Sequence, residues 1–372
     1  MSAAEQAKKL AMFRLDGGTI SVGCARCPLL SECGGYTRQG GAWSCMDQCA
    51  TCDKTTCDLV CLKKPDFARA LLEVGGFGHR GIPHLLQPEG PIPRYVPALQ
   101  HGIGDDVPLD WAAIPLSSLM RFRRGTYRPT ATSALELRAA FGLPSHARLI
   151  LLGTGKDRGI EQYWRWHRMH GTPAALAMLG FTCGVVPNYS LFLEDPRPQH
   201  LFNRKRSLLC AAAWSKSGMP AIPYLQAVAP FDWRFWESFL HEHDEIVSVA
   251  KEFQTGLALQ ERGQLAIDNL ARLQDQLGRR LHLFAIGGAQ YRSDIARRFD
   301  AWTVIDSTPF MKAVKRRVAT RPTRRITWLP AVGENVVELL LTNVGQYTEW
   351  LSRADLDGGN CDRRRPTAFR GQ

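Results

Sequence analysis

Short apolar runs alternate with amphipathic stretches along most of the chain, from about residue 95 onward. The apolar runs, rich in β-branched and aromatic residues, predict strands at Tyr95–Leu99, Trp111–Leu116, Leu149–Gly153, Thr182–Pro187, Ala221–Gln226, Ile246–Lys251, His282–Ile286 and Trp302–Asp306. The stretches between them predict helices, among them Ser133–Phe141, Ile160–His170, Asn203–Lys216, Arg234–His241, Gln264–Leu277 and Ser293–Phe299. Strands that alternate with helices favour a parallel sheet, and eight strands are the number that closes a barrel. We therefore predict an α/β fold, a (β/α)8 TIM-like barrel, with an open doubly wound sheet as the alternative.

Three segments of different composition divide the chain of 372 residues. Residues 1–64 predict a small cysteine-rich module, residues 65–325 hold the alternating strands and helices, and residues 326–372 contain a closing helix and a basic tail. One barrel-sized domain with a small appendage is the expected division for this length. Because no signal-peptide pattern and no long apolar run occur, we expect a cytoplasmic protein without a membrane partner.

Eight of the eleven cysteines lie between residues 24 and 61. Without a secretion signal, such a cluster is typical of metal ligation rather than of disulfides. Eight thiolates suffice for two tetrahedral zinc ions, and iron–sulfur clusters are the alternative. The C-x3-C-x2-C spacing that begins at Cys45 resembles that of radical S-adenosylmethionine enzymes. The predicted metal ligands are Cys24, Cys27, Cys33, Cys45, Cys49, Cys52, Cys57 and Cys61.

The chain is strongly basic, with a formal net charge of +12 from 47 Lys and Arg against 35 Asp and Glu. Such a surplus raises the expectation of a polyanionic partner, most simply nucleic acid. Several basic residues follow predicted strands, where they would line one rim and bind phosphates; Arg158, Arg204 and Lys205 are candidates. Solvated surface charge is the alternative for each basic run.

Two carboxylates stand at the ends of predicted strands. Asp306 ends the run that begins at Trp302, and Asp157 follows the apolar strand Leu149–Gly153. Functional side chains gather at the carboxyl ends of the strands in parallel barrels, so both are candidates for catalysis. For Asp306 the alternative is a helix cap, since a basic helix-like segment, Met311–Arg317, follows it.

Four short motifs follow one another at strand ends: Asp157–Gln162, Ile222–Gln226, Leu283–Gly288 and Val304–Ser307. They resemble, in that order, the D-S-G-G-[FY]-Q, V-Q-G-G, L-x-G-[IV]-G and F-D-[CS] motifs of the tRNA-guanine transglycosylase superfamily, which includes 7-deazaguanine DNA-modification relatives. The resemblance covers about residues 92–317. It implies an enzyme that flips a base out of its stack and cuts an N-glycosidic bond. It further implies that Asp306 is the nucleophile and Asp157 the acid/base.

Other residues at strand ends are candidates for base or nucleic-acid binding. The resemblance places Asn188 where the family has an Asp that reads guanine, and Gln226 in the place of the strand-five glutamine. The replacement by Asn188 argues against guanine as the recognised base. Lys251 and Glu252 end a further strand, where they either touch the substrate or form a structural ion pair.

The combined prediction is a DNA glycosylase that excises a flipped, modified base, with a role in defence against phage. DNA is favoured over tRNA because the RNA-binding region that follows the barrel in the transglycosylases is not recognisable. The alternatives are a base-exchanging transglycosylase acting on DNA or tRNA, an iron–sulfur radical enzyme, and a non-catalytic nucleic-acid-binding protein.

Overall fold

The computed structural model describes residues 73–104, 106–191, 197–228, 230–254, 257, 260–320 and 325–354. The predicted cysteine module, with all eight proposed metal ligands, lies outside these ranges, as does the basic tail after residue 354. Among the helices within these ranges, none is both long and apolar enough to cross a membrane.

The centre of the structure consists of eight strands that pair in parallel. They are β1 (Tyr95–Pro97), β2 (Trp111–Pro115), β5 (Arg148–Leu152), β6 (Cys183–Val185), β7 (Ala221–Ile222), β8 (Ser248–Glu252), β9 (His282–Ile286) and β10 (Ala301–Asp306). One sheet has the order β1-β10-β9-β8 and the other β2-β5-β6-β7. Isolated parallel bridges join β1 to β2, between Ala98 and Ala113, and β7 to β8, between Tyr224 and Ala250. The predicted α/β class with parallel strands is confirmed.

The strands form where apolar runs are buried on both faces. Leu149–Leu152 of β5 and Leu283–Ile286 of β9 are buried without interruption, as expected for parallel strands covered on two sides. Strand β7 is shorter than predicted because Pro223, which has no N–H, interrupts it. The carbonyl of Pro223 still accepts a hydrogen bond from the amide of Ala250, so β7 and β8 stay adjacent.

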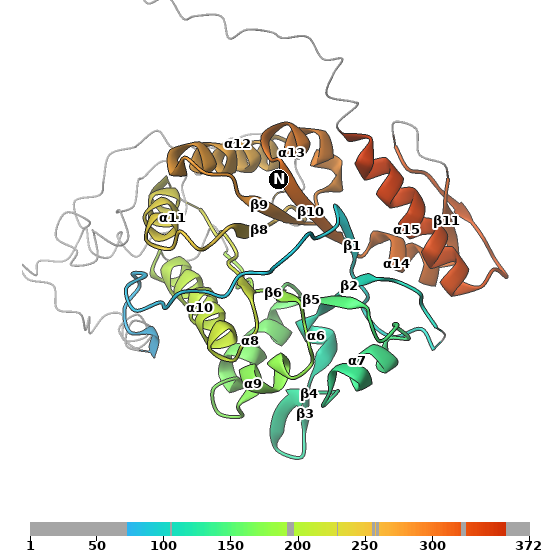
Figure 1. The fold of residues 1–372 in the computed structure, drawn as a ribbon, viewed down its shortest axis with the longest axis horizontal. Helices are drawn as coiled ribbons and strands as arrows, with labels where there is room; N and C mark the ends of the chain where they lie inside the picture. The colour runs from blue at the N-terminus through green and yellow to red at the C-terminus, as the bar shows by residue number, and fades with distance from the viewer. Residues whose placement is uncertain are drawn as a thin grey trace, which may run out of the picture.

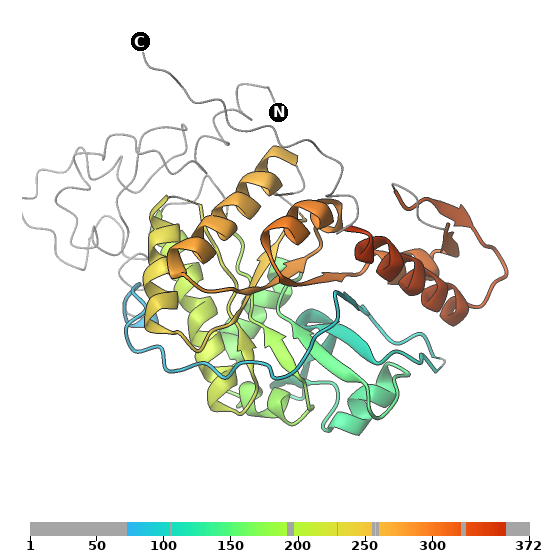
Figure 2. The ribbon, with the colours of Figure 1, turned by 45° about the horizontal axis from the view of Figure 1, so that its top comes forward.

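Helices surround the strands and separate them along the chain (Figures 1 and 2). They are α6 (Leu116–Leu119), α7 (Ala134–Ala140), α8 (Asp157–Trp166), α9 (Thr172–Ala177), α10 (Arg197–Lys216), α11 (Pro230–Glu242), α12 (Gln260–Leu277), the 3-10 turn η1 (Ala289–Tyr291), α13 (Arg292–Arg298), α14 (Thr308–Val314) and α15 (Val336–Ser352). All six helices predicted between strands are present with shifted ends. Side-chain caps mark some of these ends; Ser133, for example, accepts from the amide of Glu136 at the start of α7.

An antiparallel hairpin, β3 (Met120–Arg123) with β4 (Thr126–Pro129), projects from the segment after β2. The sequence indicated only a basic run here. The two turn residues, Arg124 and Gly125, have φ angles of 48° and 75°, which is the left-handed geometry that tight hairpin turns require. A left-handed arginine gives no signal in the sequence, so the hairpin was missed.

The C-terminal part packs beside β1 and β10. Strand β11 (Arg317–Ala319) pairs antiparallel with β12 (Trp328–Pro330), so the predicted boundary at residue 325 falls inside a hairpin. Helix α15 lies against α14 and β11 at one side of the molecule (Figure 1). Its Asn343 is fully buried and accepts a hydrogen bond of 2.6 Å from the amide of Ala319, which fixes the helix to the hairpin.

Candidate functional site

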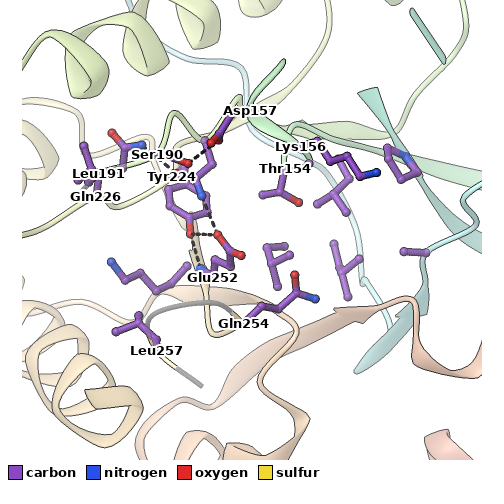
Figure 3. Close-up of a pocket in the computed structure, with 18 of the residues that line it drawn as sticks. Thr154, Lys156, Asp157, Ser190, Leu191, Tyr224, Gln226, Glu252, Gln254 and Leu257 are labelled. Carbon is purple, nitrogen blue, oxygen red and sulfur yellow. Dashed lines mark hydrogen bonds between the residues drawn. The ribbon is translucent and has the colours of Figure 1, made fainter. Parts of the chain in front are cut away.

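A cavity of about 1000 Å³ opens at the carboxyl ends of the parallel strands. Apolar residues such as Leu152, Ile286 and Ile305 form part of its wall. Figure 3 shows the side chains that point into it from several strand ends. The polar residues that line it are Gln100, Ser117, Thr154, Lys156, Asp157, Asn188, Ser190, Tyr224, Gln226, Lys251, Glu252, Gln254, Arg262 and Ser307. Acidic, basic and amide groups therefore face one space.

Asp157 is the first residue of α8 and lies exposed at the rim. The hydroxyl of Ser190 donates a hydrogen bond of 2.5 Å to its Oδ1 (Figure 3). The two residues meet because the segment after β5 is tied to the segment after β6: the amide of Gly153 donates to Val185, and the amide of Asn188 donates to Gly153. The end of one strand thereby positions the loop of the next.

A second carboxylate, Glu252 at the end of β8, is held by a chain of polar side chains. Its Oε2 accepts from Asn188 Nδ2 at 2.8 Å and lies 3.5 Å from Tyr224 Oη. The same Tyr224 hydroxyl accepts from the Glu252 amide at 2.6 Å. Gln226 Nε2 donates to Asn188 Oδ1 at 2.8 Å and to the carbonyl of Tyr189. Asn188 thus links the predicted base-binding residues Gln226 and Glu252 into one network.

The loop after β6, residues 188–190, contacts both cavity carboxylates, and a buried arginine supports it. The Arg206 guanidinium lies 3.8 Å from the ring centroid of Tyr189 and forms two hydrogen bonds, of 2.6 and 2.8 Å, with the Glu161 carboxylate. Burial raises the pKa of the Tyr189 hydroxyl well above its ordinary value, so it stays neutral. The packing of Arg206 against Tyr189 therefore supports the loop segment that carries Asn188 and Ser190.

Lys251 lines the cavity and is only 7% exposed. Within the described part of the chain it forms no ion pair, so the structural pairing with Glu252 that the sequence left open is not formed. Burial lowers the pKa of its ammonium group to about 8, although the charges of Glu252 and Asp232 act in the opposite direction. Its position at the cavity wall is compatible with the other alternative from the sequence, contact with a substrate.

Asp306 does not line the cavity, although its neighbours Ile305 and Ser307 do. Successive strand residues point to opposite faces, and Asp306 points toward α15. Its Oδ2 accepts from the Tyr347 hydroxyl at 2.8 Å and its Oδ1 accepts from the Thr308 amide at 2.7 Å. Unlike Asp157, Asp306 is thus not among the residues that line the cavity, and its carboxylate contacts the first amide of α14 and a side chain of α15.

The three basic residues predicted at the rim have different surroundings. Arg158 is exposed on α8 near the cavity but does not line it. Arg204 is buried and pairs with Asp232 at 2.7 Å, and the buried Lys205 ammonium donates to the carbonyl of Gly78 at 2.6 Å. The predicted phosphate contacts of Arg204 and Lys205 are thus corrected: α10 turns both inward, where they bind other parts of the protein.

Several cavity residues were not predicted as site residues. Ser190 follows Asn188 by two positions, and Tyr224 precedes Gln226 by two, so closeness in the chain to predicted residues beyond a strand end is the signal that was available. Gln254 and Thr154 follow strand ends in the same way. Their residue types alone carry no signal, because Ser, Thr and Gln are common in loops.

Metal ligation at the cysteine module stays a prediction, because those residues lie outside the described ranges. Among the residues that the structure describes, no group of three or more His, Cys, Asp or Glu is arranged to hold a metal ion. The buried Cys183 and Cys210 are free thiols whose pKa burial raises to about 12, which makes them unreactive packing residues.

The comparisons with known proteins do not assign the chain to a family. No protein-family model and no curated protein matches its sequence. The case for a function therefore depends on the cavity and the residues that line it.

Proposed function

We propose that this protein cleaves the N-glycosidic bond of a flipped, modified base in nucleic acid, with DNA favoured over tRNA. The observation that carries the proposal is a cavity lined by two carboxylates from different strands, Asp157 and Glu252, together with an amide pair, Asn188 and Gln226. Its volume of about 1000 Å³ is large enough for a nucleotide unit.

The arrangement of the strands supports a (β/α)8 barrel as the scaffold. The parallel pairings inside the two sheets, together with the bridges Ala98–Ala113 and Tyr224–Ala250, connect the eight strands in chain order. In such barrels the loops after the strands form the active site, which is where this cavity lies. We include barrel closure in the proposal because it explains why residues from β5, β6, β7 and β8 face one space.

The reaction has two chemical needs that two carboxylates meet. The leaving base must receive a proton as its bond to the sugar breaks, and the sugar, which gains oxocarbenium character, must be stabilised by negative charge or captured by a nucleophile. Asp157 takes the acid/base role, as the motif resemblance implies. Glu252 takes the second role in place of Asp306, because Asn188 and Tyr224 hold it at the cavity wall.

Recognition of the base rests on the amides. Amide groups read the hydrogen-bonding edge of an extruded base. Both N–H groups of Gln226 are engaged by Asn188 and Tyr189, so its Oε1, which has no hydrogen-bond partner, is the acceptor that Gln226 offers. Asn188 and Gln226 are connected to Glu252, so base binding and catalysis share one network. The basic surplus of the chain and exposed residues such as Arg158 would hold the displaced backbone.

The proposal includes two further points that depend on the sequence alone. The cysteine module binds zinc, with an iron–sulfur cluster as the alternative, and the protein acts in defence against phage. Metal analysis of the full-length protein tests the first point. One to two zinc ions in a colourless protein support the zinc module, whereas a brown protein with visible absorbance supports the cluster alternative.

The test of the activity is mass spectrometry of the bases released when full-length protein meets a panel of ordinary and phage-modified DNAs and bulk tRNA. We expect release of one base from one modified DNA and a drop of about 10²–10⁴-fold in Asp157→Asn and Glu252→Gln. The exposed Asp300, at the opposite end of β10, gives the control Asp300→Asn, which retains activity. Release that requires a second base indicates exchange, and no release from any nucleic acid refutes the proposal.

A further inference from the structure

The side chain of Lys251 combines burial, access to the cavity and a single hydrogen bond. It stands next to Glu252 at the end of β8, lines the cavity and is 7% exposed. Its Nζ donates to the carbonyl of Leu225 at 2.8 Å and lies 5.9 Å from the ring centroid of Trp233. No carboxylate among the described residues forms an ion pair with it.

A second buried lysine shows what a purely structural role looks like in this protein. Lys205 is 3% exposed, and its ammonium group donates to the carbonyls of Gly78 and Arg80, away from the cavity. Those bonds hold the segment before β1 against α10. Lys251 has one carbonyl partner and faces a space of about 1000 Å³, an arrangement that leaves the amine able to react.

Burial also shifts the acid–base equilibrium of Lys251 toward the reactive form. Its pKa is lowered to about 8, mainly by desolvation. At pH 7.5 about a quarter of the side chains are then neutral amines, against roughly 0.1% for an ordinary lysine. A neutral amine beside a polar cavity is the form of lysine that attacks carbonyl carbons.

We propose that Lys251 is an amine nucleophile that forms an imine with C1′ of the base-free sugar, which gives the protein a strand-cleaving lyase activity at abasic sites in DNA. This inference rests on the proposed function, since base excision produces the abasic sugar. It adds a second reaction in the same cavity, after the base has left.

The reaction balances without an added oxidant or reductant. The Nζ lone pair of Lys251 attacks C1′ of the open-chain aldehyde, and the aldehyde oxygen leaves as water when the C=N bond forms. Loss of the C2′ proton to a cavity carboxylate then breaks the C3′–O bond and expels the 3′ phosphate. Water finally hydrolyses the imine and returns the free amine.

The imine is tested with full-length protein and an oligonucleotide that already carries one abasic site. Sodium cyanoborohydride reduces an imine to a stable amine, so we expect a covalent protein–DNA adduct that peptide mass spectrometry locates on Lys251. Lys251→Arg keeps the charge and Lys251→Met removes it; both should lower adduct yield at least about tenfold. The control Lys216→Met, on an exposed residue at the end of α10, retains the yield.

The outcomes separate this inference from the proposed function. An adduct on another residue, or an undiminished yield in Lys251→Arg, overturns the role of Lys251. Base release without an adduct leaves the glycosylase intact and refutes the lyase. An adduct on Lys251 without base release from any DNA supports the imine and refutes excision. Mapping the wild-type adduct needs no variant, so a failure of Lys251→Met to fold does not affect the test.

Discussion

Replacing Asp306 distinguishes a structural carboxylate from a nucleophile. The side chain is 9% exposed and accepts hydrogen bonds from the Tyr347 hydroxyl and the Thr308 amide. Burial, reinforced by the charge of Asp306, raises the pKa of Tyr347 well above its ordinary range, so this hydroxyl remains a donor at any moderate pH. The structure therefore predicts that Asp306 stabilises the contact between β10, α14 and α15 and does not react.

The expected magnitudes follow from the two hydrogen bonds. Each bond to a charged acceptor contributes about 1.5–3 kcal/mol, so Asp306→Ala, which also leaves the buried Tyr347 hydroxyl unsatisfied, should cost about 4 kcal/mol of unfolding free energy. Asp306→Asn should cost only about 1 kcal/mol, because its oxygen can face the Thr308 amide and its NH2 can face Tyr347. In melting temperature these losses correspond to about 10 and 3 °C.

Chemical denaturation and base release, measured on the same preparations, check this prediction. A double-mutant cycle with Tyr347→Phe should give a coupling energy of about 1.5–3 kcal/mol. Asp306→Asn should retain most of the base-release activity, whereas Glu252→Gln should not. An Asp306→Asn protein of native stability that has lost all release would refute the reasoning and return the nucleophile role to Asp306.

Two further predictions concern His282 in β9 and Gly153, which contacts the loop after β6. Burial lowers the pKa of His282 to about 4, below its unfolded value near 6.5, so the unfolded state binds more protons in this interval and stability falls as the pH drops. His282→Gln should remove about 2 kcal/mol of the difference in unfolding free energy between pH 7 and 4.5, and identical pH profiles would contradict this. A Cβ on Gly153 would lie 2.5 Å from Pro187 N and Val185 O, so Gly153→Ala should cost about 1–3 kcal/mol and reduce base release by displacing the loop after β6. Gly345→Ala in α15 is the control: outside its chain neighbours and the backbone of its own helix, no atom lies within 4 Å of the new Cβ, so the variant should gain up to about 1 kcal/mol. Equal stability of the two variants would show that the loop has room to move.

The order of the strands and helices is predictable from the sequence because parallel strands covered on both faces must be apolar throughout. The apolar runs that form β5 and β9 are bounded by polar and glycine residues and are short, which favours strands over helices. The same logic located Asp157, Lys251 and Glu252, since each follows or ends an apolar run, whereas Asn188 and Gln226 were placed by the motif resemblance. All five residues line the cavity.

Only the tertiary structure decided which way each side chain points and which residues it contacts. A strand buried on both faces has no polar alternation, so nothing in Trp302–Ser307 tells whether Ile305 or Asp306 faces the cavity; packing of α15 against β10 decides it. Arg204 and Lys205 read as surface charges, yet their partners are Asp232 and a carbonyl 127 residues away. The link from Asn188 to Glu252 likewise spans 64 residues. Hydrophobic periodicity is a local property that the sequence carries, whereas hydrogen-bond partners are chosen in space, after the strands have set which loops meet.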